Sequence, residues 1–234
     1  MPVYRLPTAH LFPDPNDAEP SGLLAVGGDL EPSRMLLAYC SGIFPWYSEG
    51  QPILWFSPDP RYVLYPERLH VGRSLAKIVR RGDYEIRVDT AFEAVVANCQ
   101  STPRPGQYGT WITEAMRRSL LRLHQMGVAH SFEAYQDGRL VGGLYGLSIG
   151  SFFAGESMFA HAPDASKVAF VWAVAQLRGR GVGLIDCQVE TEHLARFGAV
   201  HISRKQYLST LAPLVAREVP PERWTLNPDF VPGR

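Results

Sequence analysis

The apolar and polar residues of this chain follow a helical period in some segments and a strand period in others. Where apolar residues recur every three or four positions, one face of a helix can be buried. Pro32 begins one such segment, Thr113 caps another, and Asp89 or Thr90 could cap a third, while glycine closes several of them. Helices are therefore predicted near residues 32–42, 73–81, 90–99, 113–127, 166–178 and 203–216.

Residues 131–159 alternate with the shorter period of a β-strand. Asp137-Gly138 is a strong hairpin turn and Ile149-Gly150 marks a second reversal, so this segment predicts a three-stranded antiparallel meander. A further strand is expected over residues 183–189, directly after the helix at 166–178. Mostly antiparallel strands combined with segregated helices predict an α+β fold.

The first sixty residues differ from the rest of the chain. They are rich in proline and glycine, and two tryptophans and three phenylalanine or tyrosine residues lie between Phe44 and Phe56. We expect a small N-terminal domain of mixed helix and strand over residues 1–61, followed by a larger domain over residues 62–234. The aromatic residues either line a site or form the core of the small domain.

Composition narrows the class of protein. With 234 residues, of which 46% are hydrophobic and 20% charged, the chain is neither disordered nor fibrous. Its apolar runs are too short to span a membrane, and its N-terminus does not resemble a signal peptide. Three scattered cysteines indicate reduced thiols rather than a disulfide framework. We expect a soluble, cytoplasmic protein without membrane association.

The charges cancel overall but are unevenly distributed. The 23 basic and 23 acidic residues sum to zero, yet residues 61–87 hold seven basic and three acidic side chains. Arg73, Lys77, Arg80 and Arg81 share one face of a predicted helix because they occupy positions i, i+4, i+7 and i+8. This basic stripe suits a polyanion backbone, although a solvated helix face has the same pattern.

Polar residues on two predicted strands are the candidate catalytic groups. Alternation puts Asp186 and Gln188 on one face of their strand, and Glu156 and Met158 on one face of theirs. Buried polar groups are costly unless they are satisfied. They either position a nucleophile or relay a proton, or they form a structural hydrogen-bonded pair. The seven histidines and three cysteines show no metal-ligand spacing, so no metal is expected.

The segment QLRGRG at residues 176–181 fits the pyrophosphate-binding loop of acetyl-CoA-dependent transferases. That loop binds phosphate because it follows a strand and opens a helix. Here the segment follows a predicted helix and precedes a strand, where arginine and glycine are ordinary C-terminal capping residues. We therefore reject a phosphate-binding role for it.

Several sequence blocks together resemble the bacterial leucyl/phenylalanyl-tRNA–protein transferase family. They include GLLAVGGDL (22–30), YCSGIFPW (39–46), GTWIT (109–113), GESMF (155–159) and LIDCQV (184–189). The resemblance implies a small N-terminal domain and a GNAT-like acyltransferase domain without a cofactor. It also implies transfer of Leu or Phe, and less readily Met, from aminoacyl-tRNA to the N-terminal Arg or Lys of acceptor proteins. The products are marked for degradation by the N-end rule pathway.

The resemblance also implies roles for individual residues. Asp186 and Gln188 match the catalytic pair, and Glu156 is expected to anchor an amino group. The aromatic residues expected to hold the terminal adenosine are Trp46 and Trp111, with Leu144, Phe153, Met158 and Ile185 as apolar walls of the amino-acid pocket. Strand alternation, however, turns Phe153 and Ile185 away from Met158 and Asp186.

The basic stripe is the expected contact for tRNA, and we expect a monomer. Two alternatives remain open: a GNAT-type enzyme that uses acetyl-CoA, and a non-catalytic tRNA-binding module. The rejected phosphate loop argues against the first alternative. The joint occurrence of Asp186, Gln188 and Glu156 argues against the second.

Overall fold

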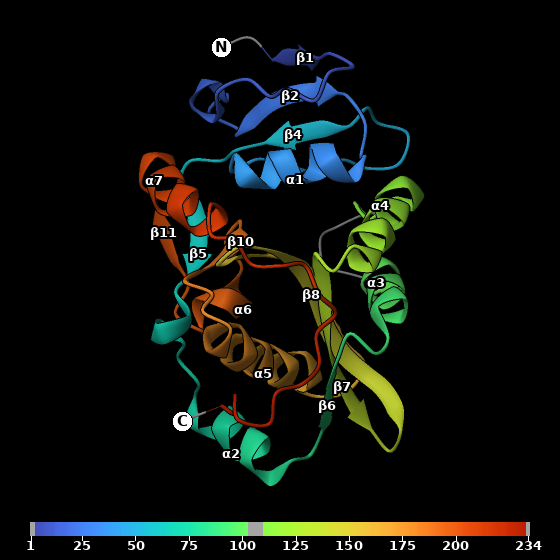
Figure 1. The fold of residues 1–234 in the computed structure, drawn as a ribbon. Coiled ribbons are helices and arrows are strands. Elements are labelled where there is room, and N and C mark those ends of the chain that lie inside the picture. The colour runs from blue at the N-terminus through green and yellow to red at the C-terminus, as the bar shows by residue number, and fades with distance from the viewer. Residues whose placement is uncertain (1–2, 103–109, 233–234) are drawn as a thin grey trace.

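The computed structural model describes residues 3–102 and 110–232. Gly109, the first residue of the GTWIT block, lies outside the described residues. A small sheet lies at one end of the molecule and a larger, strongly twisted sheet fills the rest (Figure 1). The α+β class expected from the sequence, with mostly antiparallel strands, is confirmed.

The small sheet is built from the first sixty residues. Its strand order is β1-β2-β4-β3, with β1 at Tyr4–Leu6, β2 at Leu23–Gly27, β3 at Phe44–Pro45 and β4 at Leu54–Phe56. Helix α1 (Pro32–Cys40) lies between this sheet and the rest of the molecule (Figure 1). Short 3₁₀ helices occur at Pro15–Asp17 and Pro66–Arg68.

The large sheet has the order β11-β5-β10-β9-β8-β7-β6 within the described residues. Its strands are β5 (Arg61–Leu64), β6 (Glu85–Val88), β7 (Ala129–Gln136), β8 (Arg139–Ile149), β9 (Phe152–Ala160), β10 (Leu184–Gln188) and β11 (Val200–Ile202). Strands β9 and β10 run parallel, and their neighbours in the sheet pair antiparallel. The parallel pair is possible because α5 (Ala165–Gly179) carries the chain back between them.

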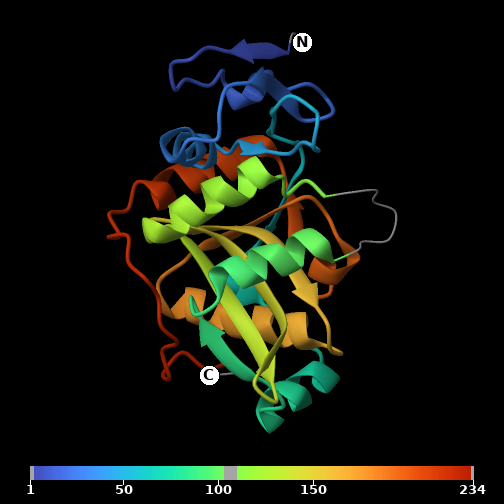
Figure 2. The same ribbon diagram turned by 90° about the vertical axis from the view of Figure 1, so that its right-hand side faces the viewer.

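Helices cover both faces of the large sheet. Helix α5 packs on one face, and α3 (Phe92–Ser101) and α4 (Glu114–Gln125) pack on the other (Figure 2). The remaining helices are α2 (Arg73–Arg81), α6 (Glu192–Ala195) and α7 (Arg204–Val215). Apolar residues of α1 and the small sheet belong to the same buried cluster as α3, α4 and the facing side of the large sheet, so a continuous core joins the two sheets.

One predicted cap is correct and another is wrong. Thr113 caps α4 by accepting a hydrogen bond from the backbone N–H of Met116. Neither Asp89 nor Thr90 caps α3, because the Asp89 carboxylate instead accepts from the backbone N–H of Ser131. The carboxylate of Glu133, from strand β7, accepts from the backbone N–H groups of Thr90 and Ala91, which lie just before α3.

The predicted alternation along β9 is broken by a β-bulge. Tyr145 pairs with Ser157 and Gly146 pairs with Gly155, so Glu156 is an extra residue opposite β8. One inserted residue exchanges the two faces of a strand. Phe153, before the bulge, and Met158, after it, therefore belong to the same apolar cluster, which corrects the prediction that they face opposite ways.

At Gly146, beside this bulge, the neighbouring strand leaves no room for a side chain. A Cβ atom there would lie 2.2 Å from the carbonyl oxygen of Ala154 and 2.5 Å from the ring of Phe153. Because a backbone carbonyl inside a sheet cannot move cheaply, we expect Gly146→Ala to lower the free energy of unfolding by roughly 2–4 kcal/mol. Urea unfolding measures this change.

The paired glycine supplies the control. A Cβ on Gly155 would meet only the carbonyl oxygen of Asp186, at 3.5 Å, and its φ lies outside the left-handed region. Gly155→Ala should therefore change the free energy of unfolding by less than about 1 kcal/mol. Equal destabilisation by the two substitutions would contradict the described register.

Candidate active site

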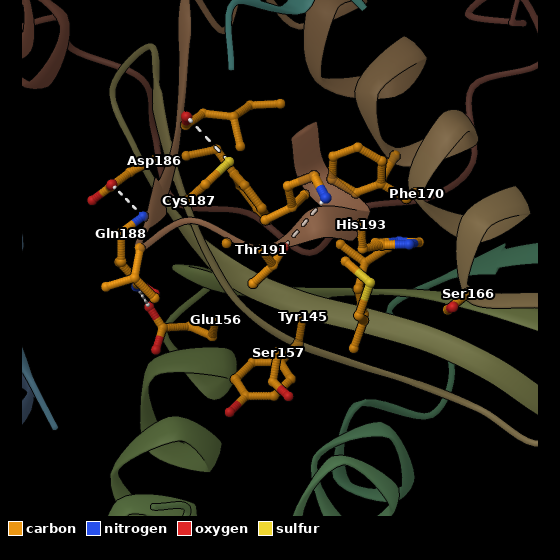
Figure 3. Close-up of a pocket in the computed structure, with 18 of the residues that line it drawn as sticks. Tyr145, Glu156, Ser157, Ser166, Phe170, Asp186, Cys187, Gln188, Thr191 and His193 are labelled. Atoms are coloured by element: carbon orange, nitrogen blue, oxygen red, sulfur yellow. Dashed lines mark hydrogen bonds between the residues drawn. The ribbon is translucent and has the colours of Figure 1, made fainter. Parts of the chain in front are cut away.

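A cavity of about 470 Å³ opens in the large sheet beside the parallel strands. Strands β9 and β10 pair as far as Ala154 and Asp186, and the residues that follow on both strands line the cavity. Because β9 and β10 separate beyond this point, their later side chains and backbone face the cavity instead of a neighbouring strand. Figure 3 shows Asp186, Gln188 and Glu156 along one wall, with Phe170 of α5 and His193 of α6 across from them.

The three candidate catalytic residues form a connected line. One oxygen of Asp186, Oδ1, accepts a hydrogen bond from the backbone N–H of Gln188 at 2.9 Å. The side-chain nitrogen Nε2 of Gln188 donates to Oε1 of Glu156, also at 2.9 Å. Residues from two strands that are separated in sequence are therefore held in one hydrogen-bonded row at the cavity wall (Figure 3).

Gln188 adopts an unusual backbone conformation. Its φ of 61° lies in the left-handed region, which non-glycine residues seldom occupy. The pairing of β10 with β5 shifts register at the same point, between Asp186 and Gln188. The simple alternation predicted for this strand therefore ends at Asp186, and the left-handed turn directs the Gln188 side chain to Glu156.

Asp186 is fully buried and paired with Arg61, a residue that the sequence analysis did not single out as a site residue. The guanidinium of Arg61 donates from Nε to Oδ1 at 2.8 Å and from Nη2 to Oδ2 at 2.6 Å. The hydroxyl of Tyr207 donates to the same carboxylate at 2.9 Å. Burial alone would lower the pKa of Arg61, but the Asp186 charge outweighs it and raises that pKa above its ordinary value. Arg61 therefore does not contribute to the exposed basic segment counted over residues 61–87.

Glu156 has a different environment from Asp186. Its Oε1 atom accepts from Gln188 and from the hydroxyl of Tyr39 in α1, at 2.9 Å each, and both donors are neutral. Burial is the largest cause that raises the pKa of Glu156 to about 7. Burial and the nearby Glu156 also raise the pKa of Tyr39 well above its usual value, so its hydroxyl remains a donor.

The predicted aromatic and apolar wall residues all line this cavity. Trp46 is 40% exposed and Trp111 is half-buried. The apolar walls also come together: Leu144, Phe153, Met158 and Ile185. The bulge in β9 brings Phe153 and Met158 to the same side, contrary to simple alternation.

Further residues line the cavity besides the predicted walls, including Ala173 and Leu177, two positions where the family resemblance implied aromatic side chains. Ala173 and Leu177 of α5 add apolar surface, and Cys187 adds a buried thiol whose pKa is raised by burial. Burial lowers the pKa of His193, whose ring lies edge-on to Phe197 with centroids 5.2 Å apart. A helical apolar period does not distinguish cavity-lining residues of α5 from ordinary core residues, so the period alone gave no signal for the cavity on this helix.

The basic stripe lies on α2, apart from the residues that line the cavity. Arg73, Lys77 and Arg80 are exposed, while the opposite face of α2 packs against the core on the α5 side. Arg81 forms an ion pair with Asp83, just beyond the end of the helix, and its Nε donates at 3.0 Å. Three cations of the stripe are therefore without an ion-pair partner among residues 3–102 and 110–232.

The described residues contain no group of three or more His, Cys, Asp or Glu side chains arranged to hold a metal ion. Nor does this part of the chain contain a helix both long and apolar enough to cross a membrane. The chemical groups that line the cavity include carboxylates, an amide, hydroxyls, a thiol, an imidazole and aromatic rings. Such a set can orient an amine beside an acyl group and handle protons and developing charge.

Comparison with known proteins identifies the family. Residues 63–212 match the model of leucyl/phenylalanyl-tRNA protein transferase, and residues 28–59 match the model of the N-terminal domain of that family. The chain is 60% identical to the leucyl/phenylalanyl-tRNA–protein transferase of Myxococcus xanthus (strain DK1622), over 96% of this chain and 97% of the relative. It is 58% identical to the protein of the same name from Anaeromyxobacter sp. (strain K), over 97% of each chain.

A GCN5-related N-acetyltransferase from Kribbella flavida aligns with a TM-score of 0.38 and 12% identity, over 68% of this chain and 56% of that chain. The sequence relationship is much stronger than this structural likeness, and it confirms the resemblance drawn from the sequence blocks. The chain belongs to the leucyl/phenylalanyl-tRNA–protein transferase family of transferase enzymes.

Proposed function

We propose that this enzyme transfers Leu or Phe, and less readily Met, from aminoacyl-tRNA to the N-terminal Arg or Lys of acceptor proteins. The products would enter the N-end rule degradation pathway. We further propose that a monomeric enzyme carries out this reaction in the cytoplasm without a cofactor. In this proposal residues 1–61 form a small domain that completes the site on a GNAT-like domain of residues 62–234.

The observation that carries the proposal is the row Asp186–Gln188–Glu156 along the wall of an apolar cavity. A flat or γ-branched side chain fits walls built from Leu144 and Met158, which supports Phe and Leu as donor amino acids. Trp46 and Trp111 offer aromatic surfaces on which a terminal adenine can stack.

The reaction itself demands positioning more than activation. The α-amine of the acceptor attacks the ester carbonyl, a C–N bond forms and the ester C–O bond breaks. The amine loses a proton, and the ribose hydroxyl of the terminal adenosine leaves with one. Because the ester is already activated, the enzyme chiefly orients the reactants and manages proton and oxyanion.

In this scheme each polar residue has a separate task. The amide oxygen of Gln188 accepts a hydrogen bond from the attacking amine, while its Nε2 is held by Glu156. Asp186, enclosed by Arg61 and Tyr207, orients Gln188 through its backbone N–H. Glu156 anchors the amino group of the bound aminoacyl ester, for which its carboxylate is suited.

The proposed function is tested by direct transfer. Radiolabelled Leu or Phe on tRNA should label a peptide that begins with Arg and leave a matched peptide that begins with Ala unlabelled. Gln188→Asn should lower turnover roughly 100-fold, because asparagine tolerates the left-handed backbone but withdraws the amide by one methylene. Equal labelling of the two peptides, or acetyl transfer from acetyl-CoA, would refute the proposal.

The raised pKa of Glu156 predicts a pH dependence of stability. A carboxyl with a folded pKa of about 7 and an ordinary value of 4.5 binds its proton more tightly when folded. Its stabilising contribution is therefore complete below pH 4.5, decreases as the pH rises, and is lost above about 7. Between these limits the wild type should lose up to roughly 3 kcal/mol relative to Glu156→Gln.

Urea unfolding of the two proteins between pH 4 and 9 measures this difference. Glu67→Gln, at an exposed carboxylate that does not line the cavity, is the control for removing a surface carboxyl. Parallel curves for the wild type and Glu156→Gln would show that Glu156 titrates as an ordinary carboxyl.

The basic stripe is proposed to contact the acceptor stem of tRNA. Lys77→Ala combined with Arg80→Ala should raise KM for charged tRNA and leave KM for an aminoacyl-adenosine donor unchanged, since that donor lacks the stem. Each lost phosphate contact should also reduce the slope of log affinity against log salt by roughly 0.7–0.9.

Arg81→Ala provides a comparison on the same helix face. Because Asp83 already neutralises Arg81, this substitution should change KM less than the loss of either unpaired cation. Unchanged KM in the double variant would identify the stripe as a solvated surface. An equal rise with both donors would indicate general damage to the fold.

A further inference from the structure

Arg61 is buried directly behind the proposed catalytic row and does not line the cavity. Only 1% of its side chain is exposed, and its partner Asp186 is fully buried. Two parallel hydrogen bonds, of 2.8 and 2.6 Å, join the guanidinium to the carboxylate. This bidentate geometry fixes the plane of the carboxylate as well as its position, which a single point charge cannot do.

The guanidinium is itself held by other segments of the chain. It lies over the ring of Phe44 at 4.7 Å and over the ring of Tyr207 at 4.6 Å. Its Nη1 donates to the carbonyl oxygen of Gly42 at 3.3 Å. Segments from the small sheet, from β5 and from α7 therefore converge on one cation, and Arg61 has little freedom to move.

Asp186 transmits this constraint to Gln188. Its Oδ1 accepts from Arg61 Nε and from the backbone N–H of Gln188, so one oxygen joins the buried cation to the left-handed turn. A non-glycine residue persists in that conformation only where its surroundings hold it there. The turn in turn determines where the Gln188 side chain meets Glu156.

We propose that Arg61 is a positioning residue of the transfer reaction, acting through Asp186 to hold Gln188 in its left-handed conformation. The expected effect on kcat rests on the proposed function. The claim that Arg61 holds Gln188 through Asp186 does not depend on it. Arg61 touches no substrate in this scheme. It ensures that the amide of Gln188 is in place before the substrates arrive.

The decisive variant is Arg61→Lys, which keeps the buried positive charge but loses the second parallel hydrogen bond and the planar stacking. We expect kcat to decrease roughly tenfold or more, because small displacements of positioning groups are costly. KM for aminoacyl-tRNA should change less than about twofold, since the cavity walls and the basic stripe are untouched. Hydrogen exchange of the segment 184–190 should accelerate, because the N–H of Gln188 loses a fixed acceptor.

The matched control is Arg34→Lys. Arg34 is another fully buried arginine, which pairs with Asp29 and donates to the carbonyl oxygens of Pro7 and Thr8 in the small sheet region. It is not connected to Asp186, so this substitution should leave kcat and the exchange of residues 184–190 unchanged. If Arg61→Lys fails to fold, Tyr207→Phe replaces it, because that variant removes the hydroxyl that donates to Asp186 and accepts from Nη2 of Arg61 at 3.5 Å.

The outcomes separate the two proposals. A decrease in kcat and faster exchange in Arg61→Lys, with neither in Arg34→Lys, would support the positioning role. Unchanged kcat in Arg61→Lys, or the same decrease in both variants, would overturn it. If the wild type transfers no amino acid, the proposed function fails, and the exchange difference alone decides whether Arg61 holds Gln188.

Discussion

The contact between Arg61 and Asp186 is the constraint on which the arrangement of the site depends. Two opposite charges withdrawn from water are tolerated only if each satisfies the other with good geometry, and here both oxygens of the carboxylate are engaged. Meeting that requirement brings Gly42 and Phe44 from the small sheet region against Arg61 of β5, and Tyr207 from α7 against both Arg61 and Asp186 of β10. The small sheet is therefore joined to the large one by a polar contact as well as by shared core.

The cavity follows from how the large sheet departs from regularity. Strands β9 and β10 pair only as far as Ala154 and Asp186, and beyond them a bulge at Glu156 and a left-handed turn at Gln188 lead the two strands apart. Either the bulge or the left-handed residue alone would redirect the side chains of one strand only. Two opposed irregularities instead bring an amide and a carboxylate together across the gap, at 2.9 Å, and leave apolar side chains to line the space behind them.

Much of this could be predicted from sequence, for identifiable reasons. Helical period and turn residues are local signals, so α2 and the β7–β9 meander were predicted close to their observed bounds, and the resemblance supplied the cavity-lining residues. Arg61 was not recognised, because its partner is 125 positions away and a local count places it with exposed cations. The bulge at Glu156 was also missed. One unpaired residue reverses which face the later side chains of the strand occupy, but the sequence does not show which residue is left unpaired.

The two carboxylates of the site show how environment assigns different tasks to the same chemical group. Asp186 faces a permanent cation and has its oxygens engaged by Arg61, Tyr207 and the Gln188 backbone, which suits a fixed anchor. Glu156 meets only neutral donors, and burial raises its pKa to about 7, so its charge can change near neutrality. Where the surroundings of paired carboxylates differ in this way, one serves as scaffold and the other can respond to the charge of a bound group. The cation of Arg61 therefore compensates the charge of Asp186, so that two acidic residues can lie side by side at one cavity.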